Sequence, residues 1–161
     1  MTNTLQWVME SKVGRLYLVA SEKGLQGVFW KKRKDPMAPS LVGDLPQSRV
    51  LAQAVRELSE YFEGQRKKFD VVLDASGTPF QLRVWKELTR IPYGSTCSYG
   101  QIASRLRTPK AVRAVGAANG RNPLSIIVPC HRVIASSGAL TGYSGGLQIK
   151  SKLLTLEKGG A

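Results

Sequence analysis

The 161-residue sequence predicts an α+β protein in two parts: a small antiparallel sheet with one helix, then a mostly helical part containing a helix-turn-helix. Three observations predict this arrangement. Apolar residues alternate or run in short stretches before residue 31, which is typical of strands. They recur every three or four residues in several later segments, which is typical of helices. The balance of charge also changes after residue 76, which indicates a domain boundary.

Three strands are expected near the N-terminus. Leu5, Trp7 and Met9 alternate with other residues, which places them on one face of a strand. Two further apolar stretches, residues 16–20 and 25–30, are separated by Ser-Glu-Lys-Gly and predict a hairpin.

A surface loop is expected after the hairpin. Residues 31–34 form a basic run, and the following segment contains prolines and a glycine that neither a helix nor a central strand tolerates. These residues are Pro36, Pro39, Gly43 and Pro46. Such a run can contact a phosphate backbone, although charged loop tips are more often only solvated.

One amphipathic helix is expected over residues 48–62, with Gly64 as its C-terminal cap. Its apolar stripe consists of Val50, Ala54, Leu58 and Phe62. Residues 69–73 are expected to form one more strand, and Asp-Ala-Ser-Gly at 74–77 is typical of a linker.

The distribution of charge divides the chain at this linker into domains of residues 1–76 and 77–161. The first holds 12 Lys or Arg against 9 Asp or Glu, net +3, whereas the second holds 12 against 2, net +10. So strong a positive charge favours a polyanionic partner for the second domain. Excess lysine and arginine also serve solubility alone, which is the other interpretation.

Three helices with recognisable start signals are expected in the second domain. Thr78-Pro79 begins a helix that runs to about Thr89. Ser98 followed by Gln101 is a capping-box pattern for a helix through Leu106. Thr-Pro at 108–109 precedes a helix over residues 110–118. The last two helices, joined by a tight turn in a basic segment, suggest a helix-turn-helix.

The second helix of this motif is rich in alanine and glycine. It lacks the Asn, Gln or multiple Arg side chains that read base edges in the major groove. Small residues let a helix approach phosphates or enter a minor groove, with Arg113 able to reach into the base stack. Tight packing inside the domain explains the same composition equally well. The candidate DNA-contacting residues here are Lys110, Arg113, Ala114 and Gly116.

Cys130 and His131 lie side by side after the apolar run 124–128, which ends at Pro129. Adjacent side chains point different ways in regular structure, so a reactive pair needs a turn or a bridging water. A buried inert thiol is the usual alternative. Two cysteines and one histidine supply neither a structural zinc site nor a disulfide framework, so we expect no metal. The other thiol, Cys97, is expected to be structural.

The residues around Cys130 form part of a longer ordered pattern. Its segments are Thr78-Pro79-Phe80-Gln81, Val84-Trp85, Ile91-Pro92-Tyr93-Gly94, Ser98-Tyr99-Gly100, Arg113-Ala114-Val115-Gly116, Asn122-Pro123, Pro129-Cys130-His131-Arg132-Val133, Gly142-Tyr143-Ser144-Gly145-Gly146, Leu153-Leu154 and Glu157. This pattern closely resembles the O6-alkylguanine-DNA alkyltransferase family, whose signature is Pro-Cys-His-Arg-Val. The resemblance covers residues 77–158. Residues 1–76 match weakly, in length and element pattern, and would correspond to the family's ribonuclease-H-like domain.

The resemblance implies a catalytic role for four residues. Cys130 would accept the alkyl group, with His131 acting through a water as its base. Glu157 would orient that histidine, and Asn122 would brace the active-site turn. Glu157 is one of only two carboxylates after residue 76, and a carboxylate at this histidine is expected to favour its protonated form. Without the resemblance, a solvated glutamate at a helix end is the default interpretation.

The resemblance also implies how the lesion is held. Tyr99 would rotate a phosphate and contact the extruded guanine, and Arg113 would fill the gap left in the stack. The base pocket would be lined by Val133, Tyr143 and Ser144.

The implied activity is DNA repair by direct reversal, an irreversible single-turnover transfer of an alkyl group from O6-alkylguanine to the cysteine after base flipping. O4-alkylthymine is a second candidate substrate. The product thioether has no reversible route back to the thiol. No cofactor is implied, and residues 1–76 lack the Cys and His that bind zinc in some relatives. The expected partner is double-stranded DNA with alkylated bases, bound by a monomer.

Two other function classes are weighed against this one. A non-catalytic protein that only binds alkyl lesions is the main alternative, although such relatives replace the acceptor cysteine. A cysteine hydrolase using Cys130 and His131 is disfavoured, because hydrolases rarely combine this pair with a basic helix-turn-helix. No apolar run approaches the roughly 20 residues that span a bilayer, and no secretion signal opens the chain, so a cytoplasmic protein without a membrane partner is expected.

Overall fold

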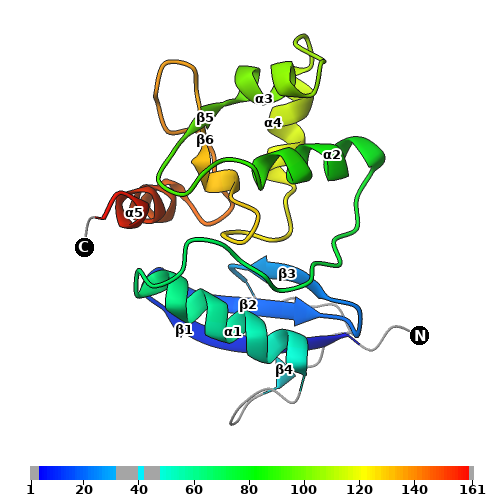
Figure 1. Ribbon diagram of the computed structural model, residues 1–161, viewed down its shortest axis with the longest axis vertical. Coiled ribbons are helices and arrows are strands. Elements are labelled where there is room, and N and C mark those ends of the chain that lie inside the picture. The colour runs from blue at the N-terminus through cyan, green and yellow to red at the C-terminus, as the bar shows by residue number, and fades with distance from the viewer. Residues whose placement is uncertain (1–3, 32–39, 42–47, 160–161) are drawn as a thin grey trace. The chain divides into compact units, whose positions relative to one another are not determined.

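The computed structural model describes residues 4–31, 40–41 and 48–159, and it divides into two compact units, Met1–Ala75 and Ser76–Ala161 (Figure 1). The boundary expected from the charge lies one residue later. Apart from Lys31, the basic run and proline-rich loop expected over residues 31–46 lie outside the described residues, except for the two-residue segment at 40–41.

The first unit contains a four-stranded sheet in the order β3-β2-β1-β4. The strands are β1 (Leu5–Ser11), β2 (Gly14–Ala20), β3 (Leu25–Phe29) and β4 (Ser40–Leu41). The first three pair antiparallel, which confirms the predicted sheet. The two-residue β4 pairs parallel to β1 and was not predicted, because it is too short to show alternation and lies among prolines.

Helix α1 (Arg49–Phe62) packs against the sheet, as the apolar stripe predicts. The Ser48 side chain caps it by accepting a hydrogen bond from the Leu51 N–H at 3.2 Å. Leu51, Ala54 and Leu58 are completely buried. Gly64, just after the helix, adopts φ 75°, a left-handed conformation that favours glycine.

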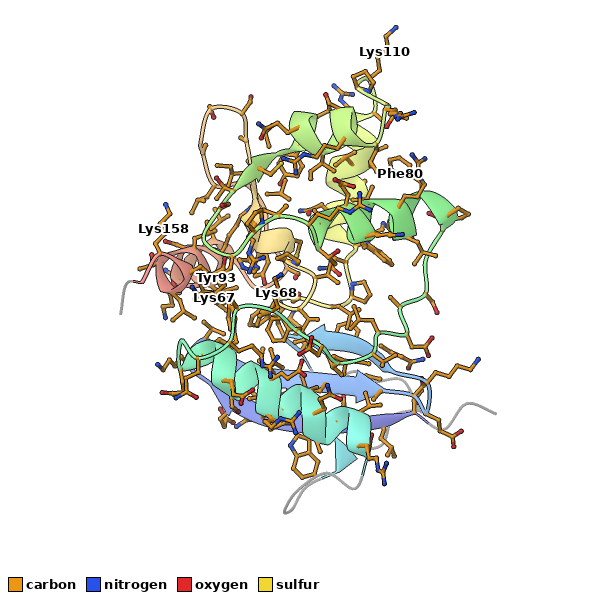
Figure 2. All side chains as sticks on the ribbon, viewed as in Figure 1. Lys67, Lys68, Phe80, Tyr93, Lys110 and Lys158 are labelled. Atoms are coloured by element: carbon orange, nitrogen blue, oxygen red, sulfur yellow. The ribbon has the colours of Figure 1, made fainter. Side chains whose placement is uncertain are left out.

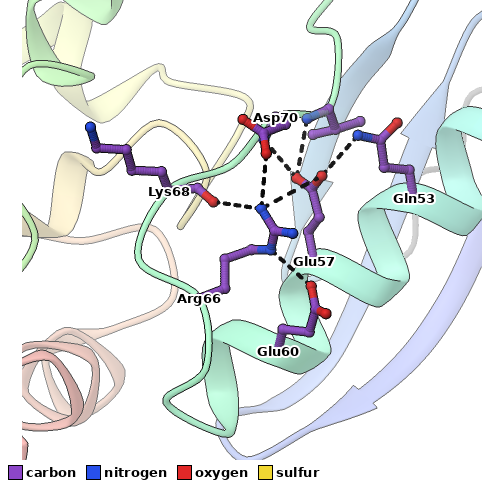
Figure 3. Close-up of polar contacts among 7 residues, drawn as sticks. Gln53, Glu57, Glu60, Arg66, Lys68 and Asp70 are labelled. Atoms are coloured by element: carbon purple, nitrogen blue, oxygen red, sulfur yellow. Dashed lines mark hydrogen bonds and ion pairs between the residues drawn. The ribbon is translucent and has the colours of Figure 1, made fainter.

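The strand predicted over residues 69–73 is wrong. Only Leu73 forms a bridge, with Leu25. The reason is Glu57, a buried side chain of α1, whose Oε1 accepts the N–H groups of Asp70 and Val71 at 2.8 and 3.1 Å (Figure 3). A backbone whose N–H groups bond a carboxylate cannot donate them to a neighbouring strand.

Helices dominate the second unit. In chain order its elements are α2 (Pro79–Leu88), β5 (Cys97–Ser98), α3 (Tyr99–Arg105), α4 (Val112–Gly120), the 3-10 helix η1 (Cys130–Arg132), β6 (Val133–Ile134) and α5 (Leu147–Glu157). Helices α3 and α4 pack together as the two helices of the predicted helix-turn-helix, and α2 packs against α4. The Trp85 indole joins α2 to the Ala118 carbonyl at 2.8 Å. None of the helices formed by described residues is long and apolar enough to cross a membrane.

The helix starts follow the sequence signals with one exception. Both Thr78 and Ser98 form complete capping boxes with the glutamine three residues later. Helix α4 begins at Val112, two residues later than expected. The Ala111 N–H bonds the Thr108 carbonyl at 2.8 Å and closes a turn before the helix starts.

Two short strands hold distant parts of the second unit together. Strands β5 and β6 pair in parallel, with Cys97 opposite Val133 and Ser98 opposite Ile134. The first pair therefore fixes the segment before α3, which begins at Tyr99, against the residue that follows η1, the short helix that Cys130 begins. Two-residue strands leave no pattern that a sequence can reveal.

Candidate active site

Cys130 begins the short helix η1, which supplies the turn that a reactive Cys-His pair requires. Asn122 braces the segment before it: its Nδ2 donates to the Val128 carbonyl at 2.8 Å, and its Oδ1 accepts from the Leu124 N–H at 3.0 Å. Ile126 adopts φ 75°, a costly conformation for a β-branched residue. The Asn122 hydrogen bonds span this strained bend.

The Cys130 thiol is in its protonated form at rest. The residue is 4% exposed, and burial raises its pKa to about 11 because a thiolate loses solvation there. A hydrogen bond from Asn122 and the positive charge of Lys150 act in the opposite direction but do not overcome burial. A proton acceptor is therefore needed before this sulfur can attack carbon.

His131 can be that acceptor. Its Nε2 lies 2.6 Å from Glu157 Oε2, and both side chains are completely buried. An ionised carboxylate only accepts, so Nε2 carries the proton and Nδ1 keeps its lone pair. Among the described residues Nδ1 has no hydrogen-bond partner. No hydrogen bond joins Cys130 to His131 directly.

Glu157 favours protonated His131, as expected, but burial outweighs its effect. Burial lowers the pKa of His131, and the nearby charges of Arg132 and Lys150 lower it further, against the opposite effect of Glu157. A neutral imidazole follows.

Arg132 shares the Glu157 carboxylate with the histidine, and sequence reasoning did not single it out. Its Nε donates to Glu157 Oε1 at 2.7 Å and its Nη2 to Oε2 at 3.0 Å. Its Nη1 donates to the Ile91 carbonyl at 2.8 Å. The sequence did contain a signal for this pairing. The domain has only two carboxylates, so an arginine in the signature motif has few possible anionic partners.

Lys150 is a second residue that sequence reasoning missed. It is completely buried on α5, and its Nζ donates to the carbonyls of Val133 and Thr141 at 2.7 and 2.8 Å. Burial lowers the pKa of Lys150, whereas Cys130 acts on it in the opposite direction. The spacing of Lys150, Leu153 and Glu157 places all three on one face of a helix, which could have predicted its burial.

The structure brings the expected base-pocket residues together only in part. Val133 is buried and follows η1 directly. Burial raises the pKa of Tyr143, the charge of Cys130 acts in the same direction, and Ser125 acts against both. Ser144 is exposed and meets Ser125 at 3.4 Å between their Oγ atoms. Tyr99 instead contacts Thr141, their hydroxyl oxygens 2.7 Å apart.

The expected DNA-contacting residues lie on and before α4. Arg113 and Ala114 are exposed, whereas Val115 is buried. Gly116 faces Tyr99, because a Cβ there would lie 3.8 Å from the tyrosine ring. Figure 2 shows Lys110 at the tip of the turn between α3 and α4, with its side chain directed away from the helices.

Cys97 is buried in β5, and burial raises its pKa, so it is protonated and unreactive at neutral pH. Among the described residues no group of three or more His, Cys, Asp or Glu side chains could hold a metal ion.

Two family models match the chain. The model described as "6-O-methylguanine DNA methyltransferase, DNA binding domain" matches residues 79–159, and that described as "6-O-methylguanine DNA methyltransferase, ribonuclease-like domain" matches residues 5–75. The two matches together span nearly the whole chain.

Similar proteins and structures carry related names. The methylated-DNA–protein-cysteine methyltransferase of Mycobacterium leprae is 49% identical over 150 residues, 93% of this chain and 90% of that protein. The protein of the same name from Methanosarcina acetivorans is 48% identical, over 93% and 96%. The crystal structure of Mycobacterium tuberculosis OGT in complex with DNA superposes with a TM-score of 0.87 and 45% identity, over 96% of this chain and 93% of that chain.

Proposed function

The chain belongs to the 6-O-methylguanine DNA methyltransferase family, and on that premise we propose that Cys130 is the cysteine to which it transfers an alkyl group from O6 of guanine in DNA. Repair of methylated DNA by alkyl transfer to a cysteine of the protein is the activity it shares with its relatives. One observation carries the assignment: a buried thiol is followed by a histidine whose Nε2 bonds Glu157 and whose Nδ1 lone pair is unused within the described structure.

The transfer is a displacement at carbon. The thiol proton of Cys130 passes through a water to Nδ1 of His131, and the sulfur attacks the alkyl carbon. The new S–C bond forms as the C–O6 bond breaks, and its electron pair stays on O6. The guanine anion then takes up one proton, so a thiol and an alkylated guanine become a thioether and guanine. Because a thioether is not reduced back to a thiol, each molecule acts once.

These reaction steps fit a neutral His131 better than an ion pair of thiolate and imidazolium formed before the substrate binds. With a Cys130 pKa of about 11 and a lowered His131 pKa, the uncharged pair is the resting state. The thiolate then forms only while an alkyl carbon is in place, which protects the sulfur from other electrophiles. Glu157, held by Arg132, keeps the imidazole in the tautomer that leaves Nδ1 available.

The second unit is proposed to bind alkylated double-stranded DNA without reading its sequence. The exposed face of α4 offers Arg113 and Ala114, and Lys110 lies on the turn before it. Small side chains admit the helix to a minor groove, phosphate contacts supply affinity, and Arg113 fills the gap left by the flipped nucleotide. Gly116 places α4 beside Tyr99, which contacts the extruded base.

Specificity for the lesion is assigned to the pocket. Val133, Tyr143 and Ser144 surround the base, and Tyr143 interacts with Cys130 itself. O4-alkylthymine carries its alkyl group on a similar exocyclic oxygen and is the second substrate proposed. Every catalytic residue belongs to residues 77–161, so a monomer working inside the cell, where its DNA lies, is sufficient.

Peptide mass mapping tests the assignment. After incubation with duplex DNA that contains O6-methylguanine, we expect one added methyl group on the peptide with Cys130 and none on that with Cys97. Cys97→Ser is the matched control and should react as the wild type does. A methyl group on Cys97, or lesion binding without any transfer, would contradict the proposal, the latter in favour of a non-catalytic lesion-binding protein.

A further inference from the structure

Thr141 contacts both the Tyr99 hydroxyl and the Lys150 ammonium, two groups that are far apart in the sequence. Its Oγ1 lies 2.7 Å from the hydroxyl oxygen of Tyr99, and its backbone carbonyl accepts a hydrogen bond from Lys150 Nζ at 2.8 Å. The residue itself belongs to the segment between β6 and α5, which has no helix or strand. Thr141 is half-buried, so both contacts are partly shielded from water.

We propose that Thr141 is a positioning residue that directs the Tyr99 hydroxyl at the flipped base, and thereby contributes to lesion recognition. The inference rests on the proposed function, in which Tyr99 contacts the extruded guanine. Neither the signature motif nor the catalytic assignments above include Thr141.

The chemistry of the two hydroxyl groups indicates which of them donates the hydrogen bond. A phenol has one proton to donate and also accepts. When Thr141 donates to the Tyr99 oxygen, the phenolic proton remains available for an acceptor nitrogen of the guanine ring. The opposite direction would spend that proton on Thr141 and leave the base facing a lone pair. Only the first arrangement lets Tyr99 donate to a ring nitrogen of the purine.

The surroundings of Tyr99 explain why its hydroxyl needs a partner. Its backbone is fixed by the Ser98 capping box and by β5, and one side of its ring lies near Gly116. These contacts hold the near end of the side chain. The hydroxyl end of the side chain contacts Thr141, and this contact sets the torsion of the phenol O–H.

Lys150 extends the connection to the sulfur. The same ammonium group that holds the Thr141 carbonyl also holds Val133 and acts electrostatically on Cys130. The position of residue 141 is therefore fixed relative to the thiol. When Thr141 sets the direction of the Tyr99 hydroxyl, a base that bonds this hydroxyl is therefore also held at a fixed position relative to the Cys130 sulfur.

Single-turnover methyl transfer from duplex O6-methylguanine, measured over a range of lesion concentrations, tests the proposal. Thr141→Val keeps the shape and removes the hydroxyl, so we expect about a fivefold lower rate at limiting lesion, the worth of one net hydrogen bond. Thr141→Ser retains the hydroxyl and should react as the wild type. Ser136→Ala, an exposed hydroxyl of the same segment, is the matched control and should also be unchanged.

A double-mutant cycle with Tyr99→Phe separates positioning from a structural role. If Thr141 acts through the phenol, the double variant loses no more than Tyr99→Phe alone. Losses that add, a wild-type rate for Thr141→Val, or equal losses in the Val and Ser variants would each overturn the inference while wild-type transfer to Cys130 stands. Failure of the wild type to methylate Cys130 would remove the proposed function as well.

Discussion

Glu57 in the first unit and Glu157 in the second are both buried carboxylates near an arginine, but their partners differ. Glu57 accepts from the Gln53 amide at 2.8 Å and from two backbone N–H groups, and Arg66 lies 3.9 Å away (Figure 3). None of these donors changes its protonation near neutral pH. Glu157 instead bonds Arg132 and the one histidine of the chain.

The difference shows what turns a buried carboxylate into part of an active site. Around Glu57 the donors only attach a loop to a helix, so the arrangement is structural. Around Glu157 the histidine keeps one ring nitrogen that has no partner among the described residues. A buried acceptor left open costs stability, and it persists here in the residue that follows a protonated thiol in the sequence.

The largest effect is expected from Glu157→Gln. The amide no longer fixes the tautomer that leaves Nδ1 available, and Arg132 loses its counter-ion. We expect the methyl-transfer rate per folded molecule to fall about a hundredfold, at the lower end of what general base catalysis contributes. Single-turnover kinetics on duplex O6-methylguanine measure it, with the folded fraction taken from circular dichroism. A rate within twofold of the wild type would contradict the role of Glu157.

The matched change in the first unit, Glu57→Gln, should lower the stability of the protein and leave the transfer rate unchanged. The two N–H groups of residues 70 and 71 lose a charged acceptor, so the free energy of unfolding should fall by about 2 kcal/mol. The transfer rate per folded molecule should stay unchanged. Urea denaturation measures the stability, and the kinetic assay measures the transfer rate. A slower transfer rate per folded molecule would contradict the purely structural role of Glu57.

The pH dependence of transfer sharpens the contrast. Because the pKa of His131 is lowered from 6.5 by burial, the base is neutral at pH 7, and the rate should fall only on the acid side of that value. The stability contribution has the same sign: the unfolded chain binds the proton more readily, so stability is present above pH 6.5 and is lost as the pH falls below it.

Arg132→Met should move this acid limb upward. Without the guanidinium, Glu157 acts on the histidine alone and raises its pKa, so the rate at neutral pH should fall several-fold and recover as the pH rises. Arg132→Lys keeps the charge and should move the limb less. A pH–rate profile checks both variants, and an acid limb unmoved by Arg132→Met would contradict the role of Arg132.

The same contrast explains what the sequence could predict. Helix caps such as Ser98 with Gln101, and the alternation of Leu5, Trp7 and Met9, depend on residues a few positions apart and were visible. The strand expected over residues 69–73 was wrong because Glu57, 13 residues earlier, takes the N–H groups. A capture of this kind leaves no periodic pattern.

In the candidate site, too, residues close together in the sequence were predictable and contacts between distant residues were not. The signature singled out Cys130 and His131, but the contact between His131 and Glu157 spans 26 residues and entered only through the family resemblance. Lys150 and Thr141 were missed because a buried lysine and an ordinary loop threonine show their roles only through backbone carbonyls and a hydroxyl 42 residues away.

The smallest effects are expected from two equivalent helix caps, one in each unit. Ser48→Ala and Ser98→Ala each remove a side chain that accepts a backbone N–H, at 3.2 and 3.1 Å, and each should lower the free energy of unfolding by about 1 kcal/mol. Only Ser98 precedes Tyr99, so only Ser98→Ala should also slow methyl transfer, by loosening the residue that contacts the base. Paired urea denaturation and transfer assays measure both quantities. Equal rates in the two variants would show that α3 positions Tyr99 without its cap, leaving that task to the contact with Thr141.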